Sequence, residues 1–244
     1  MFKKYWKFFV IFWSVLLVGI IGVFVFFWLI SAGKLGFMPT FEELENPNNR
    51  FASEVYFADG PIMNRYFEKE NRKYIEYREI PQSVIDALIA TEDVRFYDHS
   101  GIDVRGLFRV AKGLLTANTS AGGGSTISQQ LAKMLFPRES DLNVFELVIR
   151  KFREWVIAVR LEKSYTKEEI LTMYLNKFDF LNNAVGIKTA ANTYFSKEPK
   201  DLSIEEAATL VGMCKNPSLY NPKRFNERSR GRRNVVLDQM RKAG

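Results

Sequence analysis

The sequence predicts a mainly α-helical protein, in which one transmembrane helix and a small β-hairpin precede a helical domain. Three features predict this fold class: a long uncharged apolar run near the N-terminus, an Asp-Gly pair between two short alternating stretches, and helical periodicity after Pro81. The 244 residues suffice for one mid-sized domain with appendages.

The N-terminal apolar run extends over residues 8–30 and contains no charge. As a helix it would be about 34 Å long, enough to cross a hydrocarbon core of about 30 Å. Lys3, Lys4 and Lys7 precede the run, so the positive-inside rule predicts that residues 1–7 form a cytoplasmic tail. The alternative is a cleaved signal peptide, whose apolar core would have only about 7–15 residues. We therefore expect a single-pass anchor with the rest of the chain outside the membrane.

The stretch after the anchor, residues 31–80, is polar and rich in glycine and proline at its start. Residues 53–57 and 62–67 flank an Ala-Asp-Gly-Pro sequence, which favours a hairpin turn. We assign residues 31–80 to a linker with a β-hairpin and residues 81–244 to the helical domain.

The composition excludes some kinds of site but does not identify the ligand. Lys and Arg number 35 against 28 Asp and Glu, a net charge of +7, which suits nucleic acid, anionic lipid or a phosphorylated substrate alike. The single cysteine, Cys214, excludes an internal disulfide, and we expect it to be buried in its apolar run. No HExxH or CxxC zinc motif is present.

The helix after Pro81 places one carboxylate at the edge of the core. Val84, Ile85 and Leu88 share a face, and Glu92 follows them at helical spacing. Glu92 is therefore expected to lie half-buried near the helix end, as suits a general base.

A glycine-rich stretch, residues 122–124, leads into a second helix. Thr126 and Gln129 have capping-box spacing, and the exposed N–H groups of such a helix start favour anions. Lys133 lies two turns further on the same face. No Lys precedes Ser125-Thr126, so the motif is not a nucleotide P-loop. The alternative is an ordinary capped helix after a flexible loop.

A third helix is predicted over residues 143–163. Arg150 and Glu154 lie on a different face from its apolar stripe, and they would otherwise form an exposed pair worth about 0.3–0.5 kcal/mol. Further helices are predicted to start at Thr166 and at Ser203. The residues expected to form the buried stripe are Phe145, Val148, Ile149, Phe152, Trp155, Val156 and Val159.

Five ordered blocks of the sequence resemble the peptidoglycan glycosyltransferases, which occur alone or as the first domain of class A penicillin-binding proteins. The first block, residues 92–101, reads EDVRFYDHSG and fits the family's E-D-x-x-F-x-x-H-x-G. After Asn176 the chain departs from the family's Tyr-Phe-Gly, and it has Val185 where the family's later Tyr-Gly-Ile has tyrosine, which puts the acceptor contacts in doubt. The remaining blocks are residues 124–133, 150–162, 169–176 and 205–217.

The resemblance implies a lysozyme-like, two-lobed helical fold whose smaller lobe lies against the membrane. It implies that lipid II is polymerised into glycan strands, with release of undecaprenyl pyrophosphate. Glu92 would be the general base on the acceptor hydroxyl, and Lys133 and Arg138 would stabilise the departing pyrophosphate. Glu154 would be the second catalytic carboxylate, either holding a divalent cation (Mg or Mn) or orienting those cations. No organic cofactor is expected.

The resemblance also assigns further residues to the cleft. Asp93 and His99 would support the loop that carries Glu92. The substrate-binding residues would be Ser125, Thr126, Gln129, Gln130 and Arg150, in addition to Lys133 and Arg138.

The implied location is the bacterial inner membrane, with the catalytic domain extracytoplasmic or periplasmic. The expected partners are lipid II, the nascent glycan strand, the membrane and proteins of a cell-wall synthesis complex, and no nucleic acid. The basic ending, residues 228–242, resembles class A proteins just before their second domain, so we expect truncation before a transpeptidase domain. Residues 31–34 match S-x-x-K, but no K-T-G follows, so we treat that match as chance.

Two other functions remain open at this point. A lysozyme-like hydrolase would also use a glutamate in a cleft, but it would not need cations for a pyrophosphate or a permanent anchor. A non-enzymatic anchored scaffold would tolerate substitution of Glu92 and Glu154. A nucleotide-sugar transferase is disfavoured because the sequence has no Asp-x-Asp motif.

Overall fold

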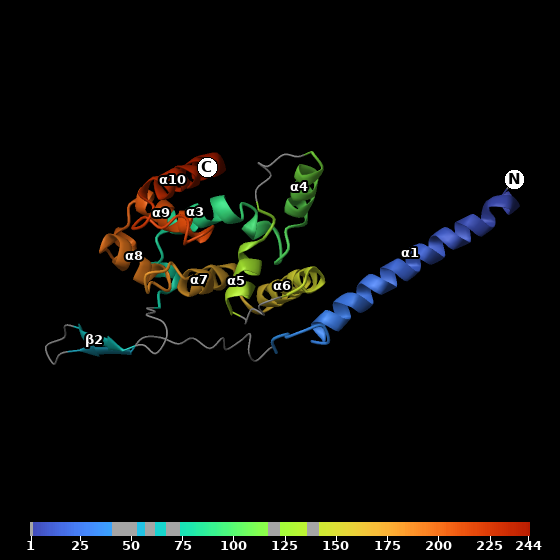
Figure 1. Cartoon of the computed structure of the whole chain (residues 1–244), viewed down its shortest axis with the longest axis horizontal. Helices are drawn as coiled ribbons and strands as arrows, with labels where there is room; N and C mark the ends of the chain where they lie inside the picture. The colour runs from blue at the N-terminus through green and yellow to red at the C-terminus, as the bar shows by residue number, and fades with distance from the viewer. Residues whose placement is uncertain (1, 41–52, 57–61, 67–73, 117–122, 136–141) are drawn as a thin grey trace.

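The computed structural model describes residues 2–40, 53–56, 62–66, 74–116, 123–135 and 142–244. A long N-terminal helix, α1 (Phe2–Ser31), extends away from a helical domain, and a hairpin of β1 (Ser53–Tyr56) and β2 (Ile62–Tyr66) lies apart from that domain (Figure 1). The elements of the domain are η1 (Tyr77–Glu79), α3 (Gln82–Glu92), η2 (Phe96–Asp98), α4 (Val104–Leu115), α5 (Ile127–Leu135), α6 (Val144–Ser164), α7 (Lys167–Lys177), α8 (Ile187–Phe195), η4 (Pro199–Asp201), α9 (Ile204–Cys214) and α10 (Asn226–Ala243). The predicted fold class is therefore confirmed.

The N-terminal helix is longer than the predicted span. It begins at Phe2, so the short basic segment before the apolar run is itself mostly helical. Its segment Tyr5–Ser31 has a mean hydropathy of 2.8, which makes it long and apolar enough to cross a membrane.

The hairpin has antiparallel strands, with Ser53 opposite Tyr66 and an irregularity between Val55 and Tyr56. The predicted Asp-Gly turn falls within residues 57–61, which lie outside the described residues.

Local sequence explains where several helices begin. Asn143, Thr166 and Ser203 each cap a helix by accepting a hydrogen bond from the backbone N–H three residues later, and each is paired with a glutamate in a capping box. The predicted starts of α7 and α9 are thus confirmed. Each such cap is worth about 1 kcal/mol.

The core of the domain is formed where α3, α5, α7 and α9 meet. Leu88, Leu131, Tyr174 and Leu210, one from each of these helices, are fully buried. Burial of each leucine contributes about 1.5–3 kcal/mol. The helix α10 packs against both α3 and α9 and so completes one side of the domain.

The folded domain begins earlier in the chain than predicted. Ile75 is fully buried, and its N–H donates to Asn176 Oδ1 at 2.9 Å while the Asn176 amide donates to the Ile75 carbonyl at 2.8 Å. Ile80 is buried as well. The predicted linker therefore extends too far toward Pro81, because the local sequence does not reveal that Ile75 and Ile80 are buried in the core of the domain.

The helix α6 forms as predicted, but of its predicted buried stripe only Ile149 is among the buried residues. Phe145 is 70% exposed and Val148 is also exposed, whereas the residues that face the core are Ile149, Ile157, Ala158 and Leu161. Part of the aromatic stripe faces α1 instead. The Phe152 ring lies 5.3 Å from the ring of Phe26 and 5.6 Å from the ring of Phe27.

Polar contacts fix the end of α1 on α6 next to these rings. The Arg160 guanidinium donates to the Ser31 carbonyl at 2.9 Å and to the Pro39 carbonyl at 3.0 Å. The anchor helix is thus attached to the same helix that carries Glu154, on another face.

Candidate active site

Glu92 is the last residue of α3. The helix buries Val84, Ile85 and Leu88, so Glu92 follows at the edge of the core, and its side chain is 14% exposed. The half-buried carboxylate predicted from the helical spacing is therefore confirmed.

Both oxygens of the Glu92 carboxylate have partners. Gln130 Nε2 donates to Oε2 at 3.0 Å, and Arg232 Nη2 donates to Oε1 at 3.3 Å. The hydroxyl of Tyr174 donates to Gln130 Oε1 at 3.0 Å, which fixes the Gln130 amide so that its NH₂ group faces Glu92.

Asp93, the residue after Glu92, ties this loop to the start of α5. Its Oδ2 accepts from the Ile127 N–H at 3.0 Å, and His99 Nε2 lies 3.0 Å from its Oδ1. Both side chains are almost completely buried. Their contacts with each other and with the start of α5 hold the loop that follows Glu92.

Thr126 and Gln129 strengthen the same junction. The Thr126 hydroxyl donates to the Gly101 carbonyl at 2.8 Å and accepts from the Gln129 N–H at 3.2 Å. The Gln129 side chain is fully buried and also donates to Gly101, at 3.2 Å. Gln129 was expected to line the cleft, but the structure places it beneath the cleft wall, because its amide is needed at this buried carbonyl.

A group of cations lies where α5 meets α6. Lys133 Nζ is 3.6 Å from Glu154 Oε2, and Lys151 Nζ is 3.1 Å from the same oxygen. Lys151 also donates to the Ser125 hydroxyl at 2.8 Å. Glu154 therefore holds two ammonium groups beside the glycine-rich start of α5.

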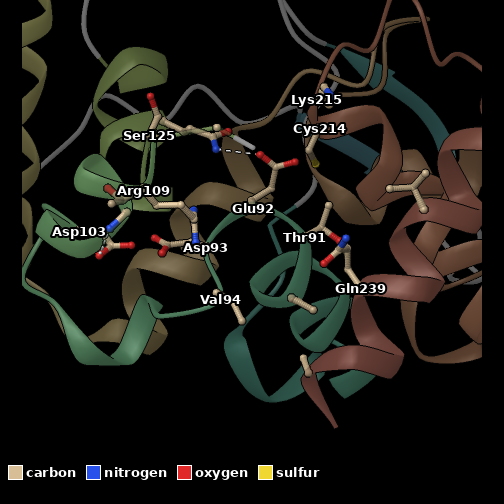
Figure 2. Close-up of a pocket in the computed structure, with 18 of the residues that line it drawn as sticks. Thr91, Glu92, Asp93, Val94, Asp103, Arg109, Ser125, Cys214, Lys215 and Gln239 are labelled. Atoms are coloured by element: carbon tan, nitrogen blue, oxygen red, sulfur yellow. Dashed lines mark hydrogen bonds between the residues drawn. The ribbon is translucent and has the colours of Figure 1, made fainter. Parts of the chain in front are cut away.

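Glu92, Gln130 and Arg232 line one cleft of about 730 Å³ together with Ser125 and Lys133, whereas Lys151 and Glu154 of α6 are not among the residues that line it. Figure 2 shows the Glu92 carboxylate between Ser125 on one side and Cys214 and Lys215 on the other. Residues from α3, α4, α5, α9 and α10 line the cleft, among them Ser125, Thr126, Gln130, Lys133, Glu92, Asp93, Arg109, Cys214, Lys215, Arg232, Gln239 and Lys242.

Two other predicted site residues, Arg138 and Arg150, are not among those that line the cleft in the described part of the chain. Arg138 lies outside the described residues. Arg150 lies one turn before Glu154 on α6 and is not among the residues that line the cleft, and the partners of Glu154 are Lys133 and Lys151.

Sequence reasoning missed Lys151 and Arg232. The spacing of Lys151, three residues before Glu154, could have revealed it, because such residues are neighbours on a helix. No local signal marks Arg232, which is 140 residues from Glu92.

Glu154 was expected to hold a divalent cation or to orient the cations of the cleft. In the structure its carboxylate has two ammonium partners, Lys133 and Lys151. Within the described ranges no group of three or more His, Cys, Asp or Glu side chains gathers in a metal-binding arrangement.

Comparison with known proteins places the chain in a family. The family model described as Transglycosylase matches residues 59–241, which is most of the chain. The chain belongs to the transglycosylase family, and it thus carries the peptidoglycan glycosyltransferase type of enzyme domain that the five sequence blocks predicted.

The similar proteins are much longer than this chain. Penicillin-binding protein 1A of Escherichia coli (strain K12) is 38% identical over 203 residues, which cover 83% of this chain and 23% of that protein. Penicillin-binding protein 1F of Bacillus subtilis (strain 168) is 41% identical over 175 residues, which cover 72% and 24%. The chain thus spans about a quarter of the length of the curated relatives it matches.

Among solved structures, the crystal structure of penicillin-binding protein 1A from Haemophilus influenzae matches with a TM-score of 0.41 and 25% identity, over 78% of this chain and 18% of that one.

Proposed function

We propose that this chain polymerises lipid II into glycan strands with release of undecaprenyl pyrophosphate. The observation that carries the proposal is that a half-buried carboxylate, Glu92, shares one cleft with Lys133, next to the glycine-rich start of α5. Glycosyl transfer from a lipid pyrophosphate needs these two functions together, a base for the attacking hydroxyl and cations for the leaving group.

The proposed reaction is a single displacement. The acceptor 4-hydroxyl gives its proton to Glu92, and its oxygen bonds to the anomeric carbon of the growing strand. The bond from that carbon to the pyrophosphate oxygen breaks, and the leaving pyrophosphate takes the electron pair. A positioned base contributes about 10²–10⁴ in rate.

Lys133, which lines the cleft, would stabilise the charge that develops on the leaving pyrophosphate. Because Glu154 contacts both Lys133 and Lys151, it would hold their ammonium groups in place before the substrate arrives. Such fixed charges need no reorganisation during the reaction, which makes them effective. We therefore assign Glu154 the role of orienting these two lysines.

The membrane is the proposed working surface. The helix α4 exposes Phe108 and Leu115 together with Arg105, Arg109 and Lys112, as a helix at an anionic lipid surface does. Both α4 and α6 lie on the side of the domain toward α1 (Figure 1). We propose a bacterial inner-membrane protein with its N-terminus in the cytoplasm and its domain on the extracytoplasmic, periplasmic side, where cell-wall synthesis proteins would be partners.

The test is polymerisation of lipid II by the full chain in detergent, with Glu92→Gln as the decisive variant. We expect Glu92→Gln to abolish polymer formation because the base is lost, while its melting temperature stays close to that of the unchanged protein. Glu168→Gln, which changes an exposed carboxylate on α7, is the matched control and should remain active.

Two outcomes would count against the proposal. One is polymer above a few per cent from the Glu92→Gln variant. The other is the release of fragments from finished peptidoglycan without polymer from lipid II, which would assign the cleft to a hydrolase.

A further inference from the structure

The second partner of Glu92 comes from α10, the last helix of the chain. Arg232 lies about two turns into α10, and its side chain is only 10% exposed. Its Nη2 is 3.3 Å from Glu92 Oε1. The charge of the part-buried Glu92 carboxylate is thus balanced by the guanidinium of Arg232, which lies on a helix that the five sequence blocks do not include.

The neighbouring helix α9 leaves room for this arginine. A Cβ atom added at Gly212 would lie 3.1 Å from Arg232 Cγ, closer than side chains normally approach. Glycine is less favourable than alanine inside a helix, so its presence at this point of α9 has a local cost in helix stability. The gain is that the stem of Arg232 passes close to the α9 backbone and reaches Glu92.

Tyr220, in the segment between α9 and α10, further restricts the position of the Arg232 guanidinium. Arg232 Cζ lies 5.9 Å from the centre of the Tyr220 ring, within the range of a cation–π contact. Arg232 Nε is buried without a hydrogen-bond partner among the residues that the structure describes. Packing therefore directs the guanidinium toward Glu92, while its Nε–H donor remains without a hydrogen-bond partner among these residues.

We propose that Arg232 is a positioning residue for Glu92 in the transfer reaction, an inference that rests on the proposed function. Gln130 occupies one lone pair of Oε2 and Arg232 one of Oε1, so the plane of the carboxylate is fixed from two sides. Each oxygen retains a lone pair, and the acceptor hydroxyl donates its proton to one of these. Arg232 itself forms and breaks no bond to the sugar. The charge on the leaving pyrophosphate is stabilised by Lys133, not by Arg232.

A purely structural ion pair between α3 and α10 is the competing explanation. It predicts lower stability when Arg232 is changed, but unchanged turnover of the molecules that remain folded. Positioning predicts a loss in kcat with little change in KM, because substrate binding is retained while the base is held in the wrong orientation.

The experiment measures lipid II polymerisation by the full chain carrying Arg232→Ala. We expect kcat to fall by about 10²-fold, as for a misplaced catalytic group, with KM within about threefold. Guanidinium ion at non-denaturing concentrations should restore part of kcat, whereas sodium chloride at equal ionic strength should not. A loose guanidinium can return the missing partner to Glu92, and a structural defect would not respond to it.

Arg233→Ala is the matched control. It removes the same charge from the next position of α10, where the side chain donates to Asn234 and does not line the cleft. We expect its kcat to match that of the unchanged protein.

Arg232→Gln keeps most of the buried stem and decides the matter if Arg232→Ala does not fold. A folded Arg232 variant with unchanged kcat, a loss confined to KM, or a loss that guanidinium does not relieve would overturn the positioning role. Failure of both variants to fold would assign Arg232 to stability and overturn it as well. Activity of Glu92→Gln would instead refute the proposed function, so the two failures are distinguishable.

Discussion

The two walls of the cleft are built in different ways. On the wall of α5, Ser125 and Lys133 line the cleft, and they contact Lys151 and Glu154 of α6, which do not line it. The wall of α9 and α10 contacts Glu92 through one arginine, Arg232, whose position depends on Gly212 and Tyr220. The first wall is a local motif and the second is a product of helix packing, so substitutions should affect them differently.

After the loss of activity expected for Glu92→Gln, the largest effects, of about 10²-fold, are expected for Arg232→Ala and, on the wall of α5, for Lys133→Ala. Lys133→Ala should lower kcat by about 10²-fold, because under the proposed function it removes a preorganised cation beside the leaving pyrophosphate. Lys151→Ala should have a smaller effect, since Lys133 lines the cleft and Lys151 does not. Rates of lipid II polymerisation by the full chain would measure both.

Lys200→Ala is the control for this pair, because Lys200 is exposed in η4 and does not line the cleft. A greater loss from Lys151→Ala than from Lys133→Ala would reverse the assigned order of the two lysines.

An intermediate effect is expected on the α9 and α10 wall from Gly212→Ala. The added Cβ would displace the stem of Arg232 by a few tenths of an ångström, and we expect kcat to fall severalfold while the protein stays folded. The comparison of kcat with the thermal melting curve tests this, since alanine favours the helix by about 0.5–1 kcal/mol. Gly231→Ala on α10, where a Cβ meets nothing within 4 Å, is the control.

The smallest signal is expected from chemical labelling of Cys214, which lines the wall of α9 and α10. Burial raises the pKa of the Cys214 thiol, and the neighbouring Glu92 carboxylate raises it further. The thiol should therefore stay protonated at neutral pH and react with iodoacetamide only when the protein unfolds. Mass spectrometry of labelled native and unfolded protein measures this, and rapid labelling of the native protein would contradict the burial of this wall.

The sequence was sufficient where short-range physics decides the structure. The apolar N-terminal run, the capping residues Thr166 and Ser203, and the helical spacing that brings Glu92 to the edge of the core all depend on neighbours within a few turns. The position of Lys133 beside Glu154 followed from the family blocks, and the structure gives it a distance of 3.6 Å.

Only the tertiary structure decided which face of α6 is buried, where the domain begins and what holds Glu92. The stripe of α6 looks like a core face because periodicity reports apolarity without naming the partner, and here Phe152 meets α1. Ile75 joins the core through Asn176, and Arg232 reaches Glu92 from α10, across 101 and 140 residues respectively. Such contacts are set by how helices pack, and that packing depends on shape and volume across the whole domain rather than on any local pattern.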